Sequence, residues 1–450
     1  MSGPGGLPAE AARLAFHWRH AGDRARERPY VQLTADQLLG AGAYLAALTH
    51  LHRAIDLLDT ITDPTARDEA ELATQLGLGS AFLATTGHAS PQMRAAFDRA
   101  EELCRTVGRH EELFRVLFGQ STSCLFRGEL PTSLELAEQC LGLAVETGDS
   151  DLLVQSEFAV GNAAYWMADF PRALEKFDRV LSLYDHERHA SHVQRFAHNP
   201  RVTCLTFGAW ATWSVGRPER ALALAEESLA LAKPTGNPFA IAIAHQILGI
   251  THQCLRNARQ TREHADALIA IPEVFPTYRI AGLMLRGWAS VLEGHVAEGI
   301  EEMLRGWHTW TSMGAGLAHG YYSTLLADAY LALGDVDAGL AMVESGNDIA
   351  VRRGERAFET ELHRLRGELL RDRDPAEAER AMRLAIELAR ARGALGLELR
   401  ATTSLARLLG ERGLGAEGRA ALHDVSARCK EGFATPDHLG AQALLAALDA

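Results

Sequence analysis

Apolar residues recur along this chain at the spacing of one face of a helix. In residues 171–185 the charged positions lie opposite an apolar stripe made of Ala173, Leu174, Phe177, Val180, Leu181 and Tyr184. Residues 218–232 and 375–390 follow the same period, and the sustained alternation that marks strands occurs nowhere in the sequence. The pattern therefore predicts amphipathic helices along the whole chain.

Turn signals divide these helices at regular intervals. One set is formed by glycines that follow helical stretches, at Gly108, Gly148, Gly314, Gly354 and Gly393, and three of the four intervals between them are 39 or 40 residues. The turns of a second set lie between these glycines and start at Gly128, Ala168, Gly216, Gly294 and Gly334. A glycine after a helix takes the left-handed conformation that ends it, and Pro131, Pro171 and Pro218 fit the first turn of the next helix. Two turns per period indicate two helices per repeat.

The repeats have the form of tetratricopeptide hairpins lengthened to about 40 residues. We predict an all-α, right-handed superhelical solenoid of about ten such hairpins, at residues 34–60, 67–107, 109–147, 150–184, 200–235, 237–272, 276–313, 315–353, 355–392 and 394–431. Small residues such as Ala173, Ala221 and Ala378 are expected where two helices approach closely. A compact helical bundle is the alternative, but it gives no reason for turns every 40 residues.

The expected organisation follows from these hairpins. Residues 1–33 would form an N-terminal linker or capping helix, 34–184 the first set of repeats, 185–199 a polar insertion, and 200–450 the second set of repeats. The last segment includes a capping helix at 436–449, which would cover the apolar edge of the final hairpin.

The charge balance and the missing motifs narrow the function. The net charge is −13, from 58 acidic and 45 basic residues, which argues against a nucleic-acid-binding surface. The only lysines are Lys176, Lys233 and Lys430, and the sequence contains no phosphate-binding loop, no dinucleotide-binding GxGxxG after a strand and no GxSxG elbow. We therefore expect no enzyme, no cofactor and no nucleic-acid partner.

The cysteines and the apolar runs indicate the compartment. No two of the six cysteines are closer than sixteen residues, so no CxxC pair exists, and a reducing cytoplasm fits best. The N-terminus lacks the features of a signal peptide, and no apolar run is long enough for a membrane span. We expect a cytoplasmic protein that does not bind a membrane.

Residues 184–202 interrupt the repeat with a segment rich in His and Arg. Insertions in solenoids often emerge on the binding face, so Arg195, His198 and Asn199 are candidate partner contacts. The same segment holds the best metal candidate, formed by His186, His189 and His192 with Asp185 nearby. A solvated polar loop explains these histidines better, and we predict no metal site.

Aromatic residues cluster in pairs such as Trp210 with Trp213 and Trp307 with Trp310, a spacing typical of packing between helices. Tyr321 and Tyr322 are adjacent and cannot both face one core, so we expect one of them to line the concave groove. Both are therefore candidate partner contacts.

Three stretches of the sequence resemble a known family. They are LAFHWRHAGD near the start, LYDHERH with NPRVTCLTFGAWATWSVGRPERAL in the middle, and ELHRLRGELL, LRATTSLARLL and EGFATPDHLGAQALL at the end. Together they resemble the C-terminal tetratricopeptide region of bacterial signalling proteins in which a class III adenylate/guanylate cyclase domain and a STAND-type ATPase precede the repeats. The resemblance covers about residues 12–449, and the last stretch is its most specific part.

The resemblance implies a sensing role without chemistry. In such architectures the repeats sense a partner or effector and hold the ATPase inactive until it binds. The cyclase and ATPase would lie before residue 1, so neither activity is carried over, although a separate ATPase or cyclase is a conceivable partner. The sequence departs from the family in the linker RERPYVQLTADQL, which is less regular than the family's first helix. It also has more histidines in the insertion than the family, and among them only His189 matches the family's pattern.

We interpret the chain as a non-catalytic protein-interaction scaffold or sensor with a regulatory role in bacterial signal transduction. Its partner would be a basic or neutral protein or peptide segment in the concave groove. The main alternative is a sensor of a small molecule or short peptide bound in the groove near residues 184–202. A metal-dependent enzyme at the His-rich insertion is a remote alternative. The sequence alone identifies neither the partner nor the oligomeric state.

Overall fold

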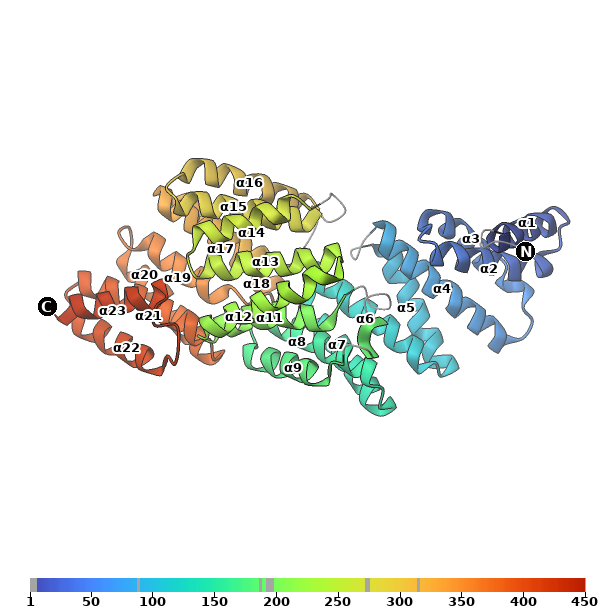
Figure 1. Ribbon diagram of the computed structural model, residues 1–450, viewed down its shortest axis with the longest axis horizontal. Helices are drawn as coiled ribbons and strands as arrows, with labels where there is room; N and C mark the ends of the chain where they lie inside the picture. Colours follow the sequence, from blue (N-terminus) through green and yellow to red (C-terminus); the bar gives the residue numbers. More distant parts are fainter. Residues whose placement is uncertain are drawn as a thin grey trace. The chain divides into compact units, whose positions relative to one another are not determined.

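The fold is a stack of helical hairpins. The computed structural model describes residues 6–86, 90–185, 188–191, 198–271, 276–313 and 316–449, and every regular element within these ranges is a helix. Ten hairpins follow one another in the described residues, with one helix before them and one after (Figure 1). The predicted all-α class and the nine predicted hairpins from 67–107 to 394–431 are confirmed.

The chain forms two compact units, Met1–Arg127 with Glu135–Leu152, and Gly128–Leu134 with Leu153–Ala450. The first unit and the helix shared by both contain α1 Gly6–His20, α2 Arg24–Gly40, α3 Tyr44–Asp56, η1 Leu58–Thr60, α4 Pro64–Thr86, α5 Pro91–Val107, α6 His110–Arg127 and α7 Leu130–Thr147. The division between the units therefore falls near α7, and it does not coincide with the predicted insertion at 185–199.

The remaining helices belong to the second unit, apart from the first turn of α8. They are α8 Ser150–Trp166, α9 Phe170–Leu183, η2 Arg188–Ser191, α11 Pro200–Ser214, α12 Pro218–Ala232, η3 Lys233–Thr235, α13 Pro238–Cys254, α14 Ala258–Ile269, α15 Pro276–Leu292, α16 Val296–Ser312, α17 His319–Leu333, α18 Val336–Arg353, α19 Glu359–Leu370, α20 Pro375–Ala391, α21 Leu395–Glu411, α22 Gly415–Arg428 and α23 Pro436–Asp449. The first helix of each hairpin from α11 to α21 contacts the first helix of the next hairpin. This neighbour-to-neighbour packing defines a repeat array.

The first hairpin differs from its prediction. We expected it at residues 34–60 after a linker ending at residue 33, but α2 begins at Arg24, so that boundary falls inside a helix. The side chain of Asp23 caps α2, and Arg53 of α3 donates two hydrogen bonds, of 2.9 and 2.7 Å, to the buried carboxylate of Glu27. These polar contacts hold the segment around Pro29 in a helix that its weak apolar pattern does not reveal.

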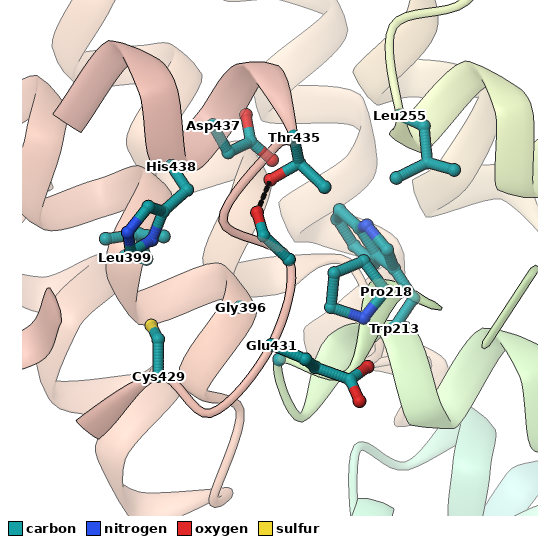
Figure 2. A pocket seen from close by; sticks show the side chains of 12 residues that line it. Trp213, Pro218, Leu255, Gly396, Leu399, Cys429, Glu431, Thr435, Asp437 and His438 are labelled. Carbon is teal, nitrogen blue, oxygen red and sulfur yellow. Dashed lines mark hydrogen bonds between the residues drawn. The ribbon is translucent and has the colours of Figure 1, made fainter. Parts of the chain in front are cut away.

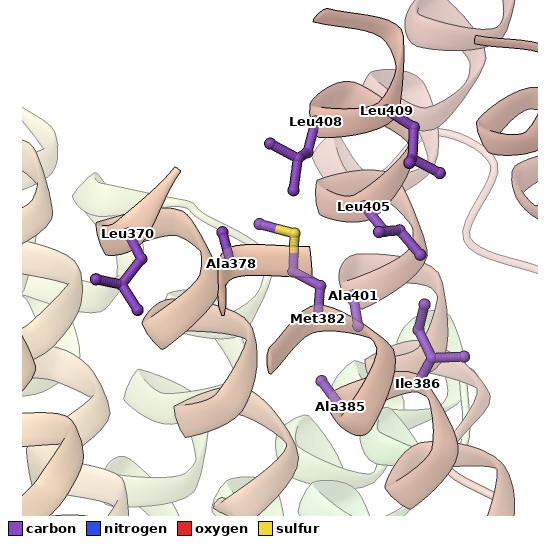
Figure 3. Close-up of a cluster of buried hydrophobic side chains, with 9 residues drawn as sticks. All are labelled: Leu370, Ala378, Met382, Ala385, Ile386, Ala401, Leu405, Leu408 and Leu409. Atoms are coloured by element: carbon purple, nitrogen blue, oxygen red, sulfur yellow. The ribbon is translucent and has the colours of Figure 1, made fainter. Parts of the chain in front are cut away.

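The core of each hairpin is built from interlocking aliphatic side chains and small residues. Between α19, α20 and α21, Met382 lies among leucines from both neighbouring helices (Figure 3). Ala173, Ala221 and Ala378 are all completely buried, as predicted for the sites of close helix approach. At Gly367 an added Cβ would lie 2.5 Å from the Cγ of Met382, so this position has no room for a side chain.

The turns also follow the prediction. Within the described residues Gly108, Gly148, Gly354 and Gly393 have φ between +63° and +75°, as helix-ending glycines require. Gly314 lies outside the described residues. Three described positions where a glycine would be favoured carry side chains, because Ala168 has φ +66°, Arg256 has φ +53° and Ala318 has φ +64°. A side chain in this region of backbone space costs about 1–2 kcal/mol.

The second unit closes on itself after five hairpins. The backbone carbonyl of Trp166, at the end of α8, accepts hydrogen bonds from the N–H groups of Arg356 and Ala357, at 2.9 and 3.1 Å. Three prolines in hairpin turns also pack against three glycines that follow hairpins, in the pairs Pro131 with Gly354, Pro171 with Gly393 and Pro218 with Gly432. The members of each pair come from hairpins five places apart. The first helices of the second unit therefore enclose an inner face.

Candidate functional site

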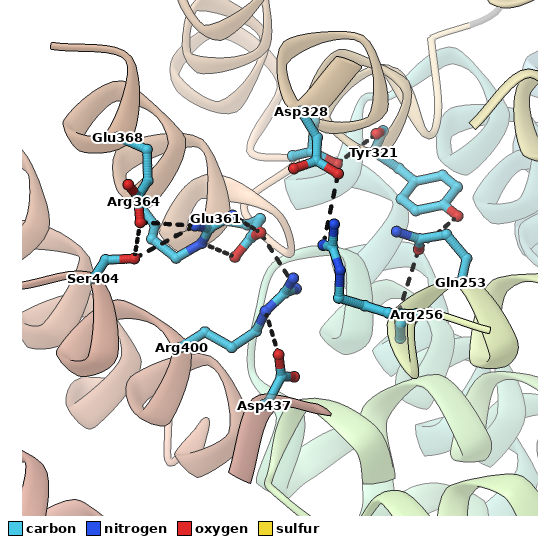
Figure 4. Close-up of polar contacts among 12 residues, drawn as sticks. Gln253, Arg256, Tyr321, Asp328, Glu361, Arg364, Glu368, Arg400, Ser404 and Asp437 are labelled. Atoms are coloured by element: carbon cyan, nitrogen blue, oxygen red, sulfur yellow. Dashed lines mark hydrogen bonds and ion pairs between the residues drawn. The ribbon is translucent and has the colours of Figure 1, made fainter. Parts of the chain in front are cut away.

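The inner face of the second unit carries a buried ionic cluster. Arg364 makes a two-pronged contact with Glu361, with donor–acceptor distances of 3.0 and 2.7 Å. Arg400 reaches the same carboxylate at 3.3 Å from α21, and its Nε lies 3.5 Å from Asp437 of α23 (Figure 4). The cluster thus joins three elements whose sequence positions span 76 residues, from Glu361 to Asp437.

A second carboxylate extends this cluster along α19. Glu368 accepts a hydrogen bond of 2.5 Å from the hydroxyl of Ser404 and lies 3.4 Å from Arg407 of α21. Arg364, Glu361 and Glu368 sit at positions i, i−3 and i+4 of one helix, so they form a continuous stripe on its inner side. This stripe explains the unusual charge of ELHRLRGELL, which departs from a simple apolar face.

The pKa values of Glu361 and Arg400 show that the charge of each group depends on its neighbours. Burial opposes ionisation of Glu361, but the neighbouring charges of Arg364 and Arg400 outweigh it and lower the pKa of Glu361 to about 2. Burial also disfavours the charge of Arg400, yet Glu361 and Asp437 raise the pKa of its guanidinium above the ordinary value. Glu361 and Arg400 are therefore both charged at neutral pH.

Arg256 brings a further charge to the inner face from the turn after α13. Its Nη1 lies 3.7 Å from Asp328 of α17, and its guanidinium lies 5.7 Å from the ring centre of Trp288. Trp288 donates its indole N–H to the same Asp328 at 3.1 Å. Arg256 thus occupies a left-handed position, unfavourable for any side chain, and points a cation at a partly buried aspartate. Strained positions of this kind concentrate at functional sites.

Aromatic side chains surround the ionic groups. Tyr321 packs against Trp210 and Phe358 with ring centres 5.2 Å apart in both cases, and its hydroxyl donates to Gln253 at 3.2 Å. The guanidinium of Arg400 lies 5.7 Å from the ring centre of Trp213. Inner helices that only had to stack would need aliphatic residues here, so the mixture of rings and ion pairs marks the surface as specialised.

Two small cavities lie within this face. One is lined by Trp213, Pro218, Leu255 and the segment from Cys429 to His438 (Figure 2). The other is lined by the aromatic residues and by Gln253, Asp328, Glu361 and Arg400. Each has a volume of about 30 Å³, enough for about two water molecules. A metabolite or peptide would therefore enter only if the inner face opened.

A buried carboxyl group links the connection between α18 and α19 to the start of α17. Glu355, in the connection between α18 and α19, accepts a hydrogen bond of 2.8 Å from the N–H of Gly320 at the start of α17. Its other oxygen is buried with no hydrogen-bond partner among the described atoms. Burial raises the pKa of Glu355 to about 8, against the effect of the backbone N–H groups.

The structure places the predicted contact residues in different surroundings. Tyr321 and Tyr322 are both buried: Tyr321 lines a cavity, and the ring of Tyr322 is nearly perpendicular to that of Trp310, with ring centres 5.4 Å apart. His198 is buried, with its ring nitrogens 2.9 Å from Gln155 and 3.1 Å from Thr203. Both histidine contacts hold the start of α11 in place.

The other two predicted contact residues of the insertion are Asn199 and Arg195. Asn199 caps α11 by accepting hydrogen bonds from the N–H groups of Arg201 and Val202. Arg195 lies outside the described residues. Contact of any of the five predicted residues with a partner stays a prediction.

The metal candidate is placed only in part, because His186 and His192 lie outside the described residues. His189 is buried, stacks on Tyr184 with ring centres 5.3 Å apart and has its Nδ1 2.8 Å from the backbone of Asp185. The described residues contain no group of three metal-ligating side chains with suitable geometry. All six cysteines are described, and they are free thiols.

Sequence comparison gives one distant relative. No protein-family model matches the chain. An uncharacterized protein of Rhizobium meliloti (strain 1021) is 22% identical over an alignment of 415 residues, and the alignment covers 89% of this chain and 39% of that protein. The chain therefore spans about two fifths of the length of the curated relative it matches.

Solved helical-repeat structures align with most of the chain at low identity. The Rap protein complexed with competence and sporulation factor is 13% identical, with a TM-score of 0.42 and coverage of 94% of this chain and 98% of that one. A STAND protein with a tetratricopeptide repeat sensor from Pyrococcus horikoshii is 12% identical, with a TM-score of 0.42 and coverage of 90% and 60%. The human IFIT1 dimer with m7Gppp-AAAA is 12% identical, with a TM-score of 0.46 and coverage of 89% and 90%. Similarity at this level carries no information about function.

The fold and site together define an all-helical repeat protein with an enclosed, charged and aromatic inner face. Within the described part of the chain, no helix is both long enough and apolar enough to cross a lipid bilayer. Glu361, Arg364, Arg400 and Asp437 did not stand out from the sequence as site residues. The available signal was charge at the inward positions of α19 and α21, which a helical-wheel alignment of the repeats would have shown.

Proposed function

We propose that this chain is a non-catalytic sensor that binds an extended segment of a protein or peptide partner on the inner face of α11, α13, α17, α19 and α21. The observation that carries the proposal is Arg256, whose guanidinium faces Asp328 from a backbone position of φ +53°. The fold favours glycine there, as it has at Gly216, Gly294 and Gly334 in equivalent turns, while the turn between α8 and α9 carries the small side chain of Ala168. Recognition of a ligand gives a reason for the side chain.

The inner face has the chemistry of a peptide-binding surface. Peptides are held in repeat grooves by polar groups that bind the backbone and by pockets for side chains. Gln253, Asp328 and Arg400 supply polar groups beside the walls formed by Trp213 and Phe358. Because the face carries charges of both signs, we expect the bound segment to carry both signs as well, within a partner that is neutral or basic overall to complement the net charge of −13.

The regulatory part of the proposal rests on the sequence. The resemblance to the repeat region of cyclase and STAND ATPase signalling proteins supports a role in cytoplasmic bacterial signalling, with an ATPase or cyclase as the controlled partner. The repeats would report occupancy of the inner face to that partner. A small-molecule effector is less favoured, because the two cavities hold only about two waters each.

Selection from a random-peptide phage library tests the binding function. Peptides that bind the purified chain should lose affinity at least about ten-fold for Asp328→Asn, because the inner face loses a charge. They should bind normally to Asp337→Asn, whose carboxylate is 84% exposed on α18. Equal loss or no loss for both variants would contradict a site on the inner face.

A further inference from the structure

The last contact that closes the second unit is made by polar groups near the surface. Glu431, in the connection between α22 and α23, accepts hydrogen bonds of 3.1 and 3.2 Å from the N–H groups of Glu219 and Arg220 at the start of α12. In return, the N–H of Gly432 donates to the carboxylate of Glu219 at 3.1 Å. Beside this reciprocal pair, Gly432 packs on Pro218, where an added Cβ would lie 2.5 Å from the proline ring.

This contact lies next to the interior. Pro218, Trp213 and Glu431 all line the cavity of Figure 2. Behind it, α21 approaches the end of α11 so closely that a Cβ on Gly396 would lie 2.7 Å from the backbone carbonyl of Trp213. These glycines allow two hairpins five places apart in the array to meet without intervening side chains.

Behind the contact, α21 meets the end of α11 through Gly396 and Trp213, and the guanidinium of Arg400 lies 5.7 Å from the ring centre of Trp213. Arg400 pairs with Asp437, which follows Glu431 by six residues, and with Glu361 on the neighbouring helix. Both ion pairs therefore lie on the α19–α23 side and do not cross to α11. Across the closure, α11 and α21 share fewer contacts than neighbouring first helices from α11 to α21 do. Adjacent hairpins are joined by aliphatic clusters such as the one in Figure 3. The second unit should therefore open first where its ends meet.

We propose that residues 431–437 form a latch that opens and closes the inner face of the second unit. When Glu431 leaves the N-terminus of α12, the hydrogen bonds between α12 and the connection before α23 are lost. The ends of α11 and α21 then separate, and Trp213, Phe358 and the ionic cluster become accessible to a polypeptide segment. The opening is inferred from these contacts alone, whereas its role in controlling access to a bound segment rests on the proposed function.

Hydrogen exchange followed by mass spectrometry tests the latch without any ligand. Gly396→Ala inserts a methyl group between α21 and the carbonyl of Trp213, and Glu431→Ala removes the acceptor at α12. The matched control is Gly440→Ala, because that helical glycine has no atom within 4 Å of an added Cβ. We expect amides in residues 210–220 and 395–401 to exchange about ten-fold faster in both latch variants and at the wild-type rate in the control.

The outcomes separate the latch from the binding proposal. Faster exchange confined to these two segments, with unchanged circular dichroism, supports the latch even if no peptide binds. Wild-type exchange in both latch variants overturns it even if peptides bind the inner face. If Gly396→Ala unfolds the chain, Glu431→Ala still decides the matter, because it changes a surface side chain and leaves the aliphatic core intact.

Discussion

Arg400 and Glu361 lie 3.3 Å apart across the first helices of the last two hairpins, and neither side chain is more than 12% exposed. An ion pair at this depth contributes little net stability, because desolvation of the two charges offsets their attraction. Removing one partner is different, since it leaves the other charge buried and unpaired. The pair therefore fixes the arrangement of α19 and α21 relative to each other.

Removing Glu361 should destabilise the second unit severely. Glu361→Ala leaves Arg364 and Arg400 without their shared carboxylate, and the expected loss is about 3–5 kcal/mol of unfolding free energy. Urea denaturation followed by circular dichroism measures it. The control is Glu301→Ala, which breaks an exposed pair with Arg305 and should change stability by less than about 1 kcal/mol. Equal effects of the two variants would show that the buried cluster is not coupled as described.

Glu355 should make the second unit less stable as pH rises. Its pKa in the fold is about 8, raised by burial from an ordinary value of 4.5, so the folded state favours the protonated carboxyl. The unfolded chain releases this proton from about pH 4.5 upward, and folding loses stability until the folded pKa is passed near pH 8. Glu355→Gln keeps an acceptor for Gly320 and cannot ionise, so its melting temperature should exceed that of wild type by a margin that grows from about pH 5 to about pH 8. A constant difference across this range would contradict the buried acid.

Arg256→Gly separates the needs of the fold from those of the site. Glycine relieves the left-handed backbone strain of about 1–2 kcal/mol, while the partly exposed pair with Asp328 is worth less than about 1 kcal/mol. The melting temperature should therefore stay equal or rise. Affinity for peptides selected on the wild-type chain should nevertheless fall. If the variant melts lower and still binds fully, Arg256 serves the fold and not the ligand.

The contact of α15 with α16 should tolerate no added methyl group. A Cβ on Gly299 would lie 2.4 Å from the carbonyl oxygen of Gly287, and a Cβ on Gly287 would lie 2.5 Å from that of Gly299. We expect Gly299→Ala to cost at least about 1–3 kcal/mol through overpacking. Gly142→Ala, in a helix with open space around it, should be neutral or stabilising by up to about 1 kcal/mol. Thermal melting of the two variants makes the comparison.

The fold could be predicted from the sequence because the residues that begin and end each helix act through their own local conformation. Turn glycines such as Gly354 and Gly393 end helices by their own conformational freedom, and prolines such as Pro171 begin the next ones, so no distant contact is needed to place them. The first hairpin was misplaced because α2 depends on the ion pair between Glu27 and Arg53, a contact across 26 residues. Local patterns do not contain such information.

The site could be predicted much less well, for the same reason. Tyr321 and Tyr322 were both candidate contacts, and Tyr321 is the one that lines a cavity, while contact of either with a partner stays a prediction. The ionic cluster was missed because Arg400, Glu361 and Asp437 become neighbours only through the stacking of hairpins. The closure that pairs Pro218 with Gly432 depends on superhelical curvature, which a repeat length alone does not determine.

Photo-crosslinking from inside the inner face tests the central claim most directly. The photoreactive residue p-benzoylphenylalanine is placed at Phe358, beside the cavity, or at Leu333, which is 49% exposed at the end of α17. Each protein is irradiated with a peptide selected by phage display. Our account predicts a covalent adduct at Phe358, a stronger adduct after Glu431→Ala opens the latch, and none at Leu333. An adduct at Leu333 with none at Phe358 would contradict it.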